Sequence, residues 1–139
     1  MVLTDTHTHL YLHEFSDDLD KVVNRAFEKK VTRLFLPSIC HKHFKSMLNL
    51  KNKFPNNIFL MSGLHPCYVN ENYEFELDQV KMYTDKNDIV AVGEIGIDLH
   101  WKKNNLDLQI NVFKKQIDIA NKYNLPVVIH CRESLTEIL

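Results

Sequence analysis

Two histidines separated by one residue lie near the start of the chain, in the run Asp5-Thr6-His7-Thr8-His9-Leu10. The short apolar segment from Val2 to Thr4 precedes them and predicts a strand. Because side chains alternate between the two faces of a strand, His7 and His9 are expected to point the same way. Neutral imidazole nitrogens are ligands for divalent cations, so the pair could bind one ion. Asp5 has the same parity and could act as a ligand or orient a histidine ring.

The spacing of two histidines leaves a second interpretation open, that of unrelated surface residues, because short motifs arise often by chance. Further polar residues favour the metal site. They stand at or just after the ends of later apolar segments, and they are His65, Glu94, Asp98, His130 and Arg132. Four of the five predicted strands therefore bring a histidine or a carboxylate to one end of the sheet. In a β/α barrel, that end is where active sites are built.

The elements that must position these residues follow from hydrophobic periodicity. Five short apolar segments predict strands, at residues 2–4, 31–36, 58–61, 89–92 and 127–129. Helical spacing predicts a first helix capped by Ser16 or Asp17, then helices at about residues 43–54, 73–84 and 106–123. Residues 133–139 begin another helix. Strict alternation of strand and helix predicts parallel strands with right-handed crossovers and helices covering the sheet.

The composition is that of an ordinary soluble globular protein, with 45% apolar and 25% charged residues among 139. The 17 Lys and Arg balance 18 Asp and Glu, so no basic excess demands nucleic acid, although a local patch could bind it. The cysteines, at 40, 67 and 131, are odd in number and far apart. They argue against a disulfide framework and favour a reducing compartment, the cytoplasm or the nucleus of a eukaryote. No apolar run approaches the length of about 18 residues that a membrane span needs, and we expect no membrane partner.

Four motifs occur in order along the chain: Asp-Thr-His-Thr-His-Leu (5–10), Gly-Leu-His-Pro (63–66), Gly-Glu-Ile-Gly-Ile-Asp (93–98) and Leu-Pro-Val-Val-Ile-His-Cys-Arg (125–132). Together they resemble the TatD family, metal-dependent hydrolases of the amidohydrolase superfamily that are mostly described as deoxyribonucleases. The resemblance implies a parallel (β/α) barrel of the TIM type and two divalent metal ions, Zn, Mg, Mn or Co. Thr8 stands where the family usually has Cys, and in a strand that position points away from the metal.

The resemblance also implies roles for individual residues. His7 and His9 would hold one ion, Glu94 would bridge or ligate both, and His130 would hold the second. Both residues could instead have a structural role only. Glu94 could form a buried ion pair, and His130 could be a hydrogen-bonded histidine of the core.

Three residues are expected around the ligands. His65 could lie in the second shell of ligands, contact a phosphate or shape a turn. Asp98 could orient a ligand or cap a turn, and Arg132 could contact a phosphate or pair with Glu133.

Two further stretches of the chain resemble functional motifs, but we interpret both as ordinary surface segments. His41 and His43 repeat the spacing of the first motif, but they lie beyond Pro37 and are expected at the surface. Trp101-Lys102-Lys103 could stack and screen a nucleic-acid strand, but a solvated loop is the favoured interpretation.

The chain departs from the family in length, because TIM-type barrels have eight strands and about 250 residues. Residues 1–139 are therefore interpreted as the N-terminal portion of one TatD-like (β/α)8 hydrolase domain, supplying its first five βα units, or as a truncated relative. A histidine after the sixth strand and an Asp after the eighth, the expected general base, would lie beyond residue 139. Two unpaired sheet edges favour a fragment, or a chain that needs a partner or associates with itself.

Three functions remain in competition. The first is a metal-dependent deoxyribonuclease that cleaves DNA phosphodiester bonds with a metal-activated water. The second is a hydrolase of the same superfamily that acts on another ester, a lactone or an amide. The third is an inactive chain that binds metal or a partner. On any of these, residues 1–139 alone are expected to be inactive.

Overall fold

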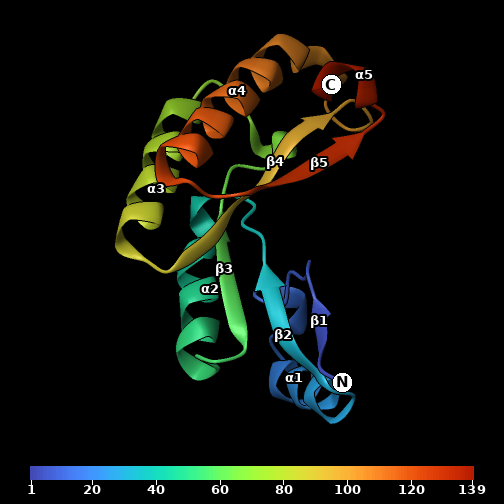
Figure 1. Ribbon diagram of the computed structural model, residues 1–139. Helices are drawn as coiled ribbons and strands as arrows, with labels where there is room; N and C mark the ends of the chain where they lie inside the picture. Colours follow the sequence, from blue (N-terminus) through green and yellow to red (C-terminus); the bar gives the residue numbers. More distant parts are fainter.

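The computed structural model describes residues 1–139 and contains one sheet of five parallel strands. The strands are β1 (Leu3–Asp5), β2 (Val31–Leu36), β3 (Ile58–Ser62), β4 (Ile89–Asp98) and β5 (Val127–Arg132). Each strand pairs with the one before it in the chain, and the sheet curls like half of a barrel (Figure 1). The predicted β/α architecture, with five strands in parallel barrel order, is confirmed.

Helices cover the outer side of the curled sheet (Figure 1). They are α1 (Leu19–Glu28), α2 (His41–Lys53), α3 (Tyr73–Lys86), α4 (Leu106–Tyr123) and α5 (Leu135–Ile138). Short 3-10 turns lie at His13–Phe15, Pro66–Tyr68 and Lys103–Asn105. The bounds of α4 match the prediction, because its apolar stripe is long and its end is marked by Leu125-Pro126. None of the helices combines the length and apolar character that crossing a membrane requires.

The last two strands are longer than predicted. β4 continues past Val92 to Asp98, and its ladder with β5 extends to the pair formed by Asp98 and Arg132. Gly93 and Gly96 lie inside the strand and permit close packing. Gly96 has a φ of +143°, and a Cβ at this position would lie 2.0 Å from the carbonyl oxygen of His130. Glu94, Asp98, His130 and Arg132 therefore lie within strands and not in the loops after them.

Two helix starts also differ from prediction. α1 begins at Leu19 with Asp18 as its N-cap residue, and Asp18 makes no side-chain capping hydrogen bond, so a cap at Ser16 or Asp17 was wrong. α2 begins at His41, where the backbone N–H donates to the Glu76 carboxylate at 3.0 Å. A carboxylate from α3 thus satisfies a free amide at the start of α2, which local sequence could not predict.

A bulge in β4 decides which side chains face the core. The register with β5 shifts between Gly93 and Ile95, which leaves Glu94 without a partner across the ladder. As a result Val92, Ile95 and Ile97 pack in one apolar cluster with residues of α3 and α4. Glu94 and Asp98 take the alternate positions, on the other face of the strand. A second cluster packs β2 and β3 against α1 and α2.

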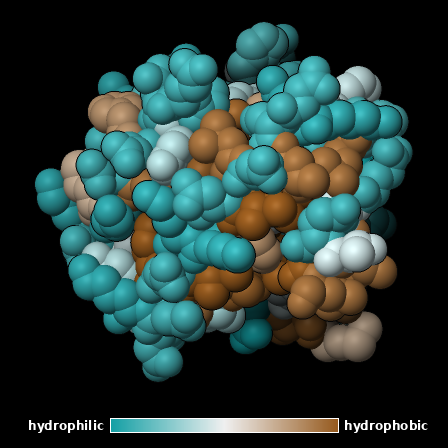
Figure 2. Space-filling model, turned by 90° about the horizontal axis from the view of Figure 1, so that it is seen from above, coloured by the Kyte–Doolittle hydropathy of each residue, from teal (hydrophilic) through white to brown (hydrophobic).

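The outer strands β1 and β5 each pair on one side only. Large apolar side chains are exposed on both, with Leu3 at 40% and Ile129 at 45% of full exposure. In the view from above, apolar side chains gather in the middle of the molecule and hydrophilic ones surround them (Figure 2). The sheet therefore leaves apolar surface and two free edges uncovered.

Candidate metal centre

Glu94 lies at the centre of a cluster of four histidines and is only 7% exposed. One carboxylate oxygen, Oε2, lies 3.2 Å from His7 Nε2 and 3.7 Å from His9 Nε2. The other, Oε1, lies 2.9 Å from His130 Nδ1 and 3.9 Å from His65 Nε2. Each oxygen thus faces a different pair of imidazoles. The pairs come from the segments after β1 and β3 and from β5, so the sheet brings together residues far apart in sequence.

His7 and His9 converge, although the reason differs from the one predicted. β1 ends at Asp5, so strand alternation does not position them. The backbone N–H of Thr8 donates to the Phe35 carbonyl at 3.0 Å and holds this segment against β2. The two Nε2 atoms lie 3.3 Å apart. The carboxylate of Asp5 accepts the backbone N–H of His7 at 3.1 Å, so it shapes the local turn and contacts neither imidazole ring.

Both ring nitrogens of His130 face carboxylates. Nδ1 lies 2.9 Å from Glu94 Oε1, and Nε2 lies 2.9 Å from Asp98 Oδ2. Asp98 also accepts the backbone N–H of Trp101 at 2.7 Å through Oδ1, so it orients a histidine and closes a turn at once. Hydrogen bonding to Glu94 raises the pKa of His130 above its ordinary value and outweighs the effect of burial.

His65 has a different hydrogen-bonding pattern from the other three histidines. Its Nδ1 accepts the backbone N–H of Cys67 at 3.1 Å, which also caps the 3-10 turn at Pro66–Tyr68. A neutral ring that accepts at Nδ1 carries its proton on Nε2. Burial lowers the pKa of His65 to about 4, so the ring is neutral at pH 7. His65 therefore presents a donor N–H to the cluster, which suits contact with an anion better than ligation of a cation.

The charges in the cluster favour a ligated cation. Burial alone would raise the pKa of Glu94, but the hydrogen bond with His130 and the nearby His65 and His7 hold it below its ordinary value. Burial also lowers the pKa of His9. At pH 7 the site thus offers an ionised carboxylate at Glu94 and a neutral imidazole at His9, which are forms that bind metals.

The donor atoms fit divalent metal ions. His7, His9 and Glu94 form one group whose ligand atoms lie within 4.8 Å of one another, and His65, Glu94 and His130 form another. A carboxylate shared by two groups is what a pair of ions about 3.5–4 Å apart requires. Imidazole and carboxylate ligands suit Zn and Mn, and Co as well. The second group is the weaker of the two, because His65 presents a proton at Nε2.

Two buried glutamines on α4 support the site, and sequence reasoning missed both. Gln116 accepts the backbone N–H of Leu64 at 2.7 Å and donates to its carbonyl at 3.0 Å. Gln109 accepts the backbone N–H of Asp98 at 2.8 Å and donates to its carbonyl at 3.2 Å. The residues beside His65 and at Asp98 are therefore held by one helix. Polar residues seven apart on the buried face of a helix were the signal available.

Tyr11 is a third supporting residue, and its role was not predicted from the sequence. Its ring is 6% exposed. Its hydroxyl donates to the Pro37 carbonyl at 2.7 Å and lies 2.8 Å from His9 Nδ1. Burial raises the pKa of Tyr11 far above its ordinary value, so the hydroxyl keeps its proton.

Arg132 and Trp101 lie outside the cluster. The Arg132 guanidinium lies over the Trp101 ring, 5.5 Å from its centroid, and Trp101 is 66% exposed. The expected pair between Arg132 and Glu133 does not form, because Glu133 contacts His100 at 2.8 Å. Trp101 therefore lies in a solvated loop, as favoured, beside one cationic side chain.

His41 and His43 are half-buried, so their assignment to the surface was wrong. His41 Nδ1 lies 2.5 Å from Glu76 Oε1, and the ring of His43 lies 5.8 Å from that of Tyr11. Packing of α3 on the start of α2 covers the first of them. Neither reaches Glu94. All three cysteines are free, as predicted.

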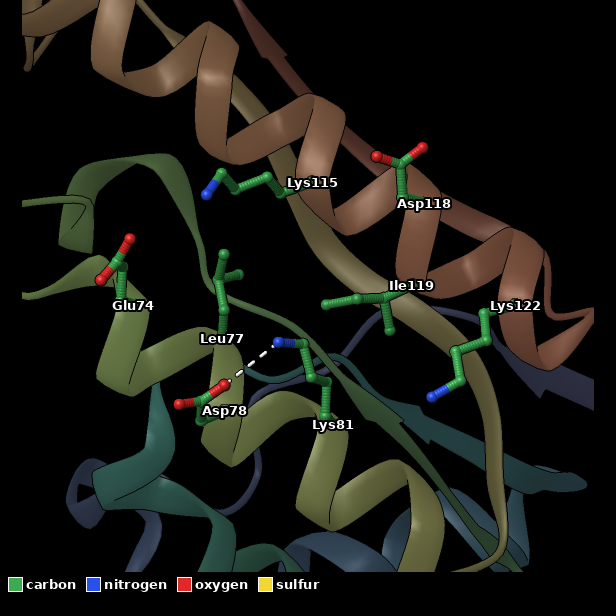
Figure 3. A pocket seen from close by; sticks show the side chains of 8 residues that line it. All are labelled: Glu74, Leu77, Asp78, Lys81, Lys115, Asp118, Ile119 and Lys122. Carbon is green, nitrogen blue, oxygen red and sulfur yellow. Dashed lines mark hydrogen bonds and ion pairs between the residues drawn. The ribbon is translucent and has the colours of Figure 1, made fainter.

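A charged hollow lies between α3 and α4, away from the histidines of the cluster (Figure 3). It has a volume of about 470 Å³. Six of its lining side chains are charged, and Lys81 donates to Asp78 at 3.1 Å. None of the cluster residues lines it. The histidine cluster instead surrounds Glu94, on the face of β4 that is turned away from α3 and α4.

Comparison with known proteins identifies the family. A family model described as TatD related DNase matches residues 4–139. The chain belongs to this family. The resemblance of the four motifs is therefore confirmed, and the half-barrel seen here is part of the TatD TIM-type fold.

Individual relatives are similar over nearly all of this chain. An uncharacterized metal-dependent hydrolase of Bacillus subtilis is 31% identical, over 99% of this chain and 54% of that protein. A putative deoxyribonuclease of Danio rerio is 32% identical, over 94% of this chain and 53% of that protein. The crystal structure of a TatD homologue of Escherichia coli, YJJV, superposes with a TM-score of 0.89 at 28% identity, covering 98% of this chain and 53% of the other. This TatD chain spans about half the length of the relatives it matches.

Proposed function

We propose that this chain carries the metal-binding part of a divalent-metal-dependent deoxyribonuclease. The observation that supports this most is the position of Glu94, whose two oxygens face different histidine pairs. In this proposal His7 and His9 would hold one ion, His130 would hold the second, and Glu94 would be a ligand of both.

When bound, two ions supply a hydroxide at neutral pH and positive charge beside a phosphate. The chain's own residues position the metal ligands and orient their rings. Asp98 holds His130 through Nε2, which turns Nδ1 toward Glu94. His65 presents an N–H that can donate to a phosphate oxygen. The ion-pair alternative for Glu94 is less apt, because His9 and His65 are neutral at pH 7 and form no ion pair with it.

DNA is the proposed substrate because the matching family is described as a DNase and the Danio rerio relative is named a putative deoxyribonuclease. The Bacillus subtilis relative is named only a metal-dependent hydrolase. Esters, lactones and amides are therefore the competing substrates, since one metal pair can serve many reactions on this fold.

We further propose that residues 1–139 form the N-terminal portion of a single (β/α)8 domain. The second ion has only two donors here, Glu94 and His130, if His65 keeps its Nε2 proton. A further histidine and a water-activating Asp would have to come from other strands. On this proposal the chain by itself binds metal but does not hydrolyse DNA.

The test combines metal binding with hydrolysis. Metal-free protein is titrated with Zn²⁺ and Mn²⁺, and the loaded protein is assayed on single-stranded DNA beside a panel of ester, lactone and amide substrates. If the gene continues past Leu139, the longer polypeptide is assayed in parallel, with Glu94→Gln as the control. Metal-dependent loss of DNA by the longer polypeptide alone supports the proposal. Turnover of an ester or amide without DNA cleavage favours the competing substrates, and absence of metal binding refutes the proposed site.

A further inference from the structure

Tyr11 connects the metal-binding segment to the neighbouring strand β2. Its hydroxyl lies 2.7 Å from the carbonyl oxygen of Pro37, the residue that follows β2, and 2.8 Å from Nδ1 of His9. The Tyr11 and His9 rings meet edge to face, with centroids 5.6 Å apart and planes at 84°. Both hydrogen-bonding partners of the hydroxyl are thus defined.

The single proton of the phenol determines the direction of both hydrogen bonds. A carbonyl oxygen can only accept, so the Tyr11 hydroxyl must donate its proton to Pro37. The same oxygen can then only accept from His9, and His9 must carry a proton on Nδ1. A neutral imidazole has one N–H, so Nε2 of His9 keeps its lone pair free. That lone pair points into the cluster, because Nε2 lies 3.3 Å from His7 Nε2 and 3.7 Å from Glu94 Oε2.

We infer that Tyr11 is a positioning residue that selects the metal-binding tautomer of His9 and fixes the orientation of its ring. The inference rests on the proposed metal site, because the tautomer matters only if Nε2 binds a cation. A hydrogen bond on the far nitrogen of a metal-binding histidine raises its basicity and restricts its rotation, and loss of such a partner typically costs about 10–100-fold in metal affinity. Glu94 and His7 cannot supply this constraint, since they face the other nitrogen.

The tautomer can be observed directly in the metal-free protein, without any substitution in Tyr11. Long-range ¹⁵N–¹H correlation spectra at pH 8 distinguish protonated from bare ring nitrogens, and His9→Asn identifies the signals of His9. We expect a protonated Nδ1 and a bare Nε2. A proton on Nε2 of His9 in the wild-type protein would overturn the inference, whatever the metal affinity is.

Tyr11→Phe removes only the hydroxyl and tests the effect on the ion. In calorimetric titration with Zn²⁺ alone, we expect an affinity lower by about 10-fold or more. Tyr123→Phe is the matched control, because its hydroxyl also makes a hydrogen bond, to Asp85 at 2.6 Å, but lies on α4 away from the cluster. The control should bind as the wild type does.

The possible results separate this inference from the proposed function. If the wild type binds Zn²⁺ and Tyr11→Phe binds within twofold of it, the positioning role is refuted while the metal site stands. If the wild type binds no Zn²⁺, the metal site and the role of Tyr11 both fail. If Tyr11→Phe does not fold, which circular dichroism detects, the tautomer of the wild type decides the question.

Discussion

Glu94 is the residue on which both halves of the candidate site depend. It stands at a bulge in β4, where no partner on β5 opposes it, and its carboxylate lies between imidazoles from three separate segments of the chain. The flanking glycines let β5 approach closely, since a Cβ on Gly93 would lie 2.7 Å from the Cβ of Val128. The local backbone therefore places the Glu94 carboxylate between the histidines.

Glu94→Gln is predicted to abolish tight metal binding. The amide keeps the size of the side chain but removes the negative charge, and an NH₂ group replaces an oxygen that faces one of the histidine pairs. The loss should exceed the factor of about 100 that removal of an outer-shell partner can cost. Metal content after reloading and dialysis measures this. Glu133→Gln, which alters an exposed carboxylate paired with His100, is the control. Equal metal content in all three proteins would contradict the prediction.

His65 and His130 both face Oε1 of Glu94, but their hydrogen bonds predict different roles. His65→Gln should keep the metal stoichiometry of the wild type, because Nδ1 accepts from Cys67 and Nε2 holds the proton. His130→Gln should reduce it, because Asp98 holds the ring of His130 so that Nδ1 faces Glu94, where an ion would bind. Metal analysis of both variants side by side checks this. A greater loss in His65→Gln would show that His65 is the ligand.

At the scale of elements, α4 acts as a rigid support for the site. Gln109 and Gln116 lie two helical turns apart and hold the backbone at Asp98 and at Leu64, next to His65. Each side-chain amide accepts a hydrogen bond from the backbone N–H of one residue and donates one to the carbonyl of the same residue, as a neighbouring strand would. The helix thereby sets the separation of two segments that bring polar side chains to Glu94.

Gln116→Leu is predicted to destabilise the fold by about 2–4 kcal/mol, because both backbone groups of Leu64 lose their partner while remaining buried. Urea denaturation measures the free energy of unfolding. Gln79, on α3, makes no such hydrogen bonds. Gln79→Leu should therefore change the free energy of unfolding by about 0.5 kcal/mol or less. A cost for Gln116→Leu no larger than that of the control would mean that water replaces the amide.

At the scale of the whole molecule, the two free edges of the sheet dominate. Residues 1–139 are predicted to associate in solution, because β1 and β5 expose unpaired backbone groups and apolar side chains. Size-exclusion chromatography with light scattering should give a mass above the 16.4 kDa of one chain.

Ile129→Lys places a charge on the β5 edge and should shift the protein toward the monomer. Phe75→Lys changes a similarly exposed apolar residue on α3, outside the sheet, and should leave the mass unchanged. A wild type that is monomeric at all concentrations would refute the association, and equal shifts in both variants would assign it to general hydrophobicity.

Much of this fold could be predicted from local sequence patterns. The five apolar segments and the helical stripes between them predicted the order of elements, and α4 was predicted to the residue. The motif residues His7, His9, Glu94 and His130 were predicted to meet at one end of the sheet, and they do. Parallel strands place their carboxyl ends together whatever the details of packing, which is why the convergence could be predicted.

Contacts between distant segments decided the bounds of some elements and the tautomers of two histidines, which local sequence patterns could not predict. The glycines of β4 lie inside the strand and allow close approach of β5, which depends on neighbours far along the chain. The start of α2 is set by Glu76 of α3, and the tautomers of His9 and His65 are set by Tyr11 and by the Cys67 amide. The sequence by itself determined which chemical groups reach the site. Hydrogen bonds between distant segments decided how each group presents its proton or its lone pair, because direction is a property of the folded contacts and not of residue type.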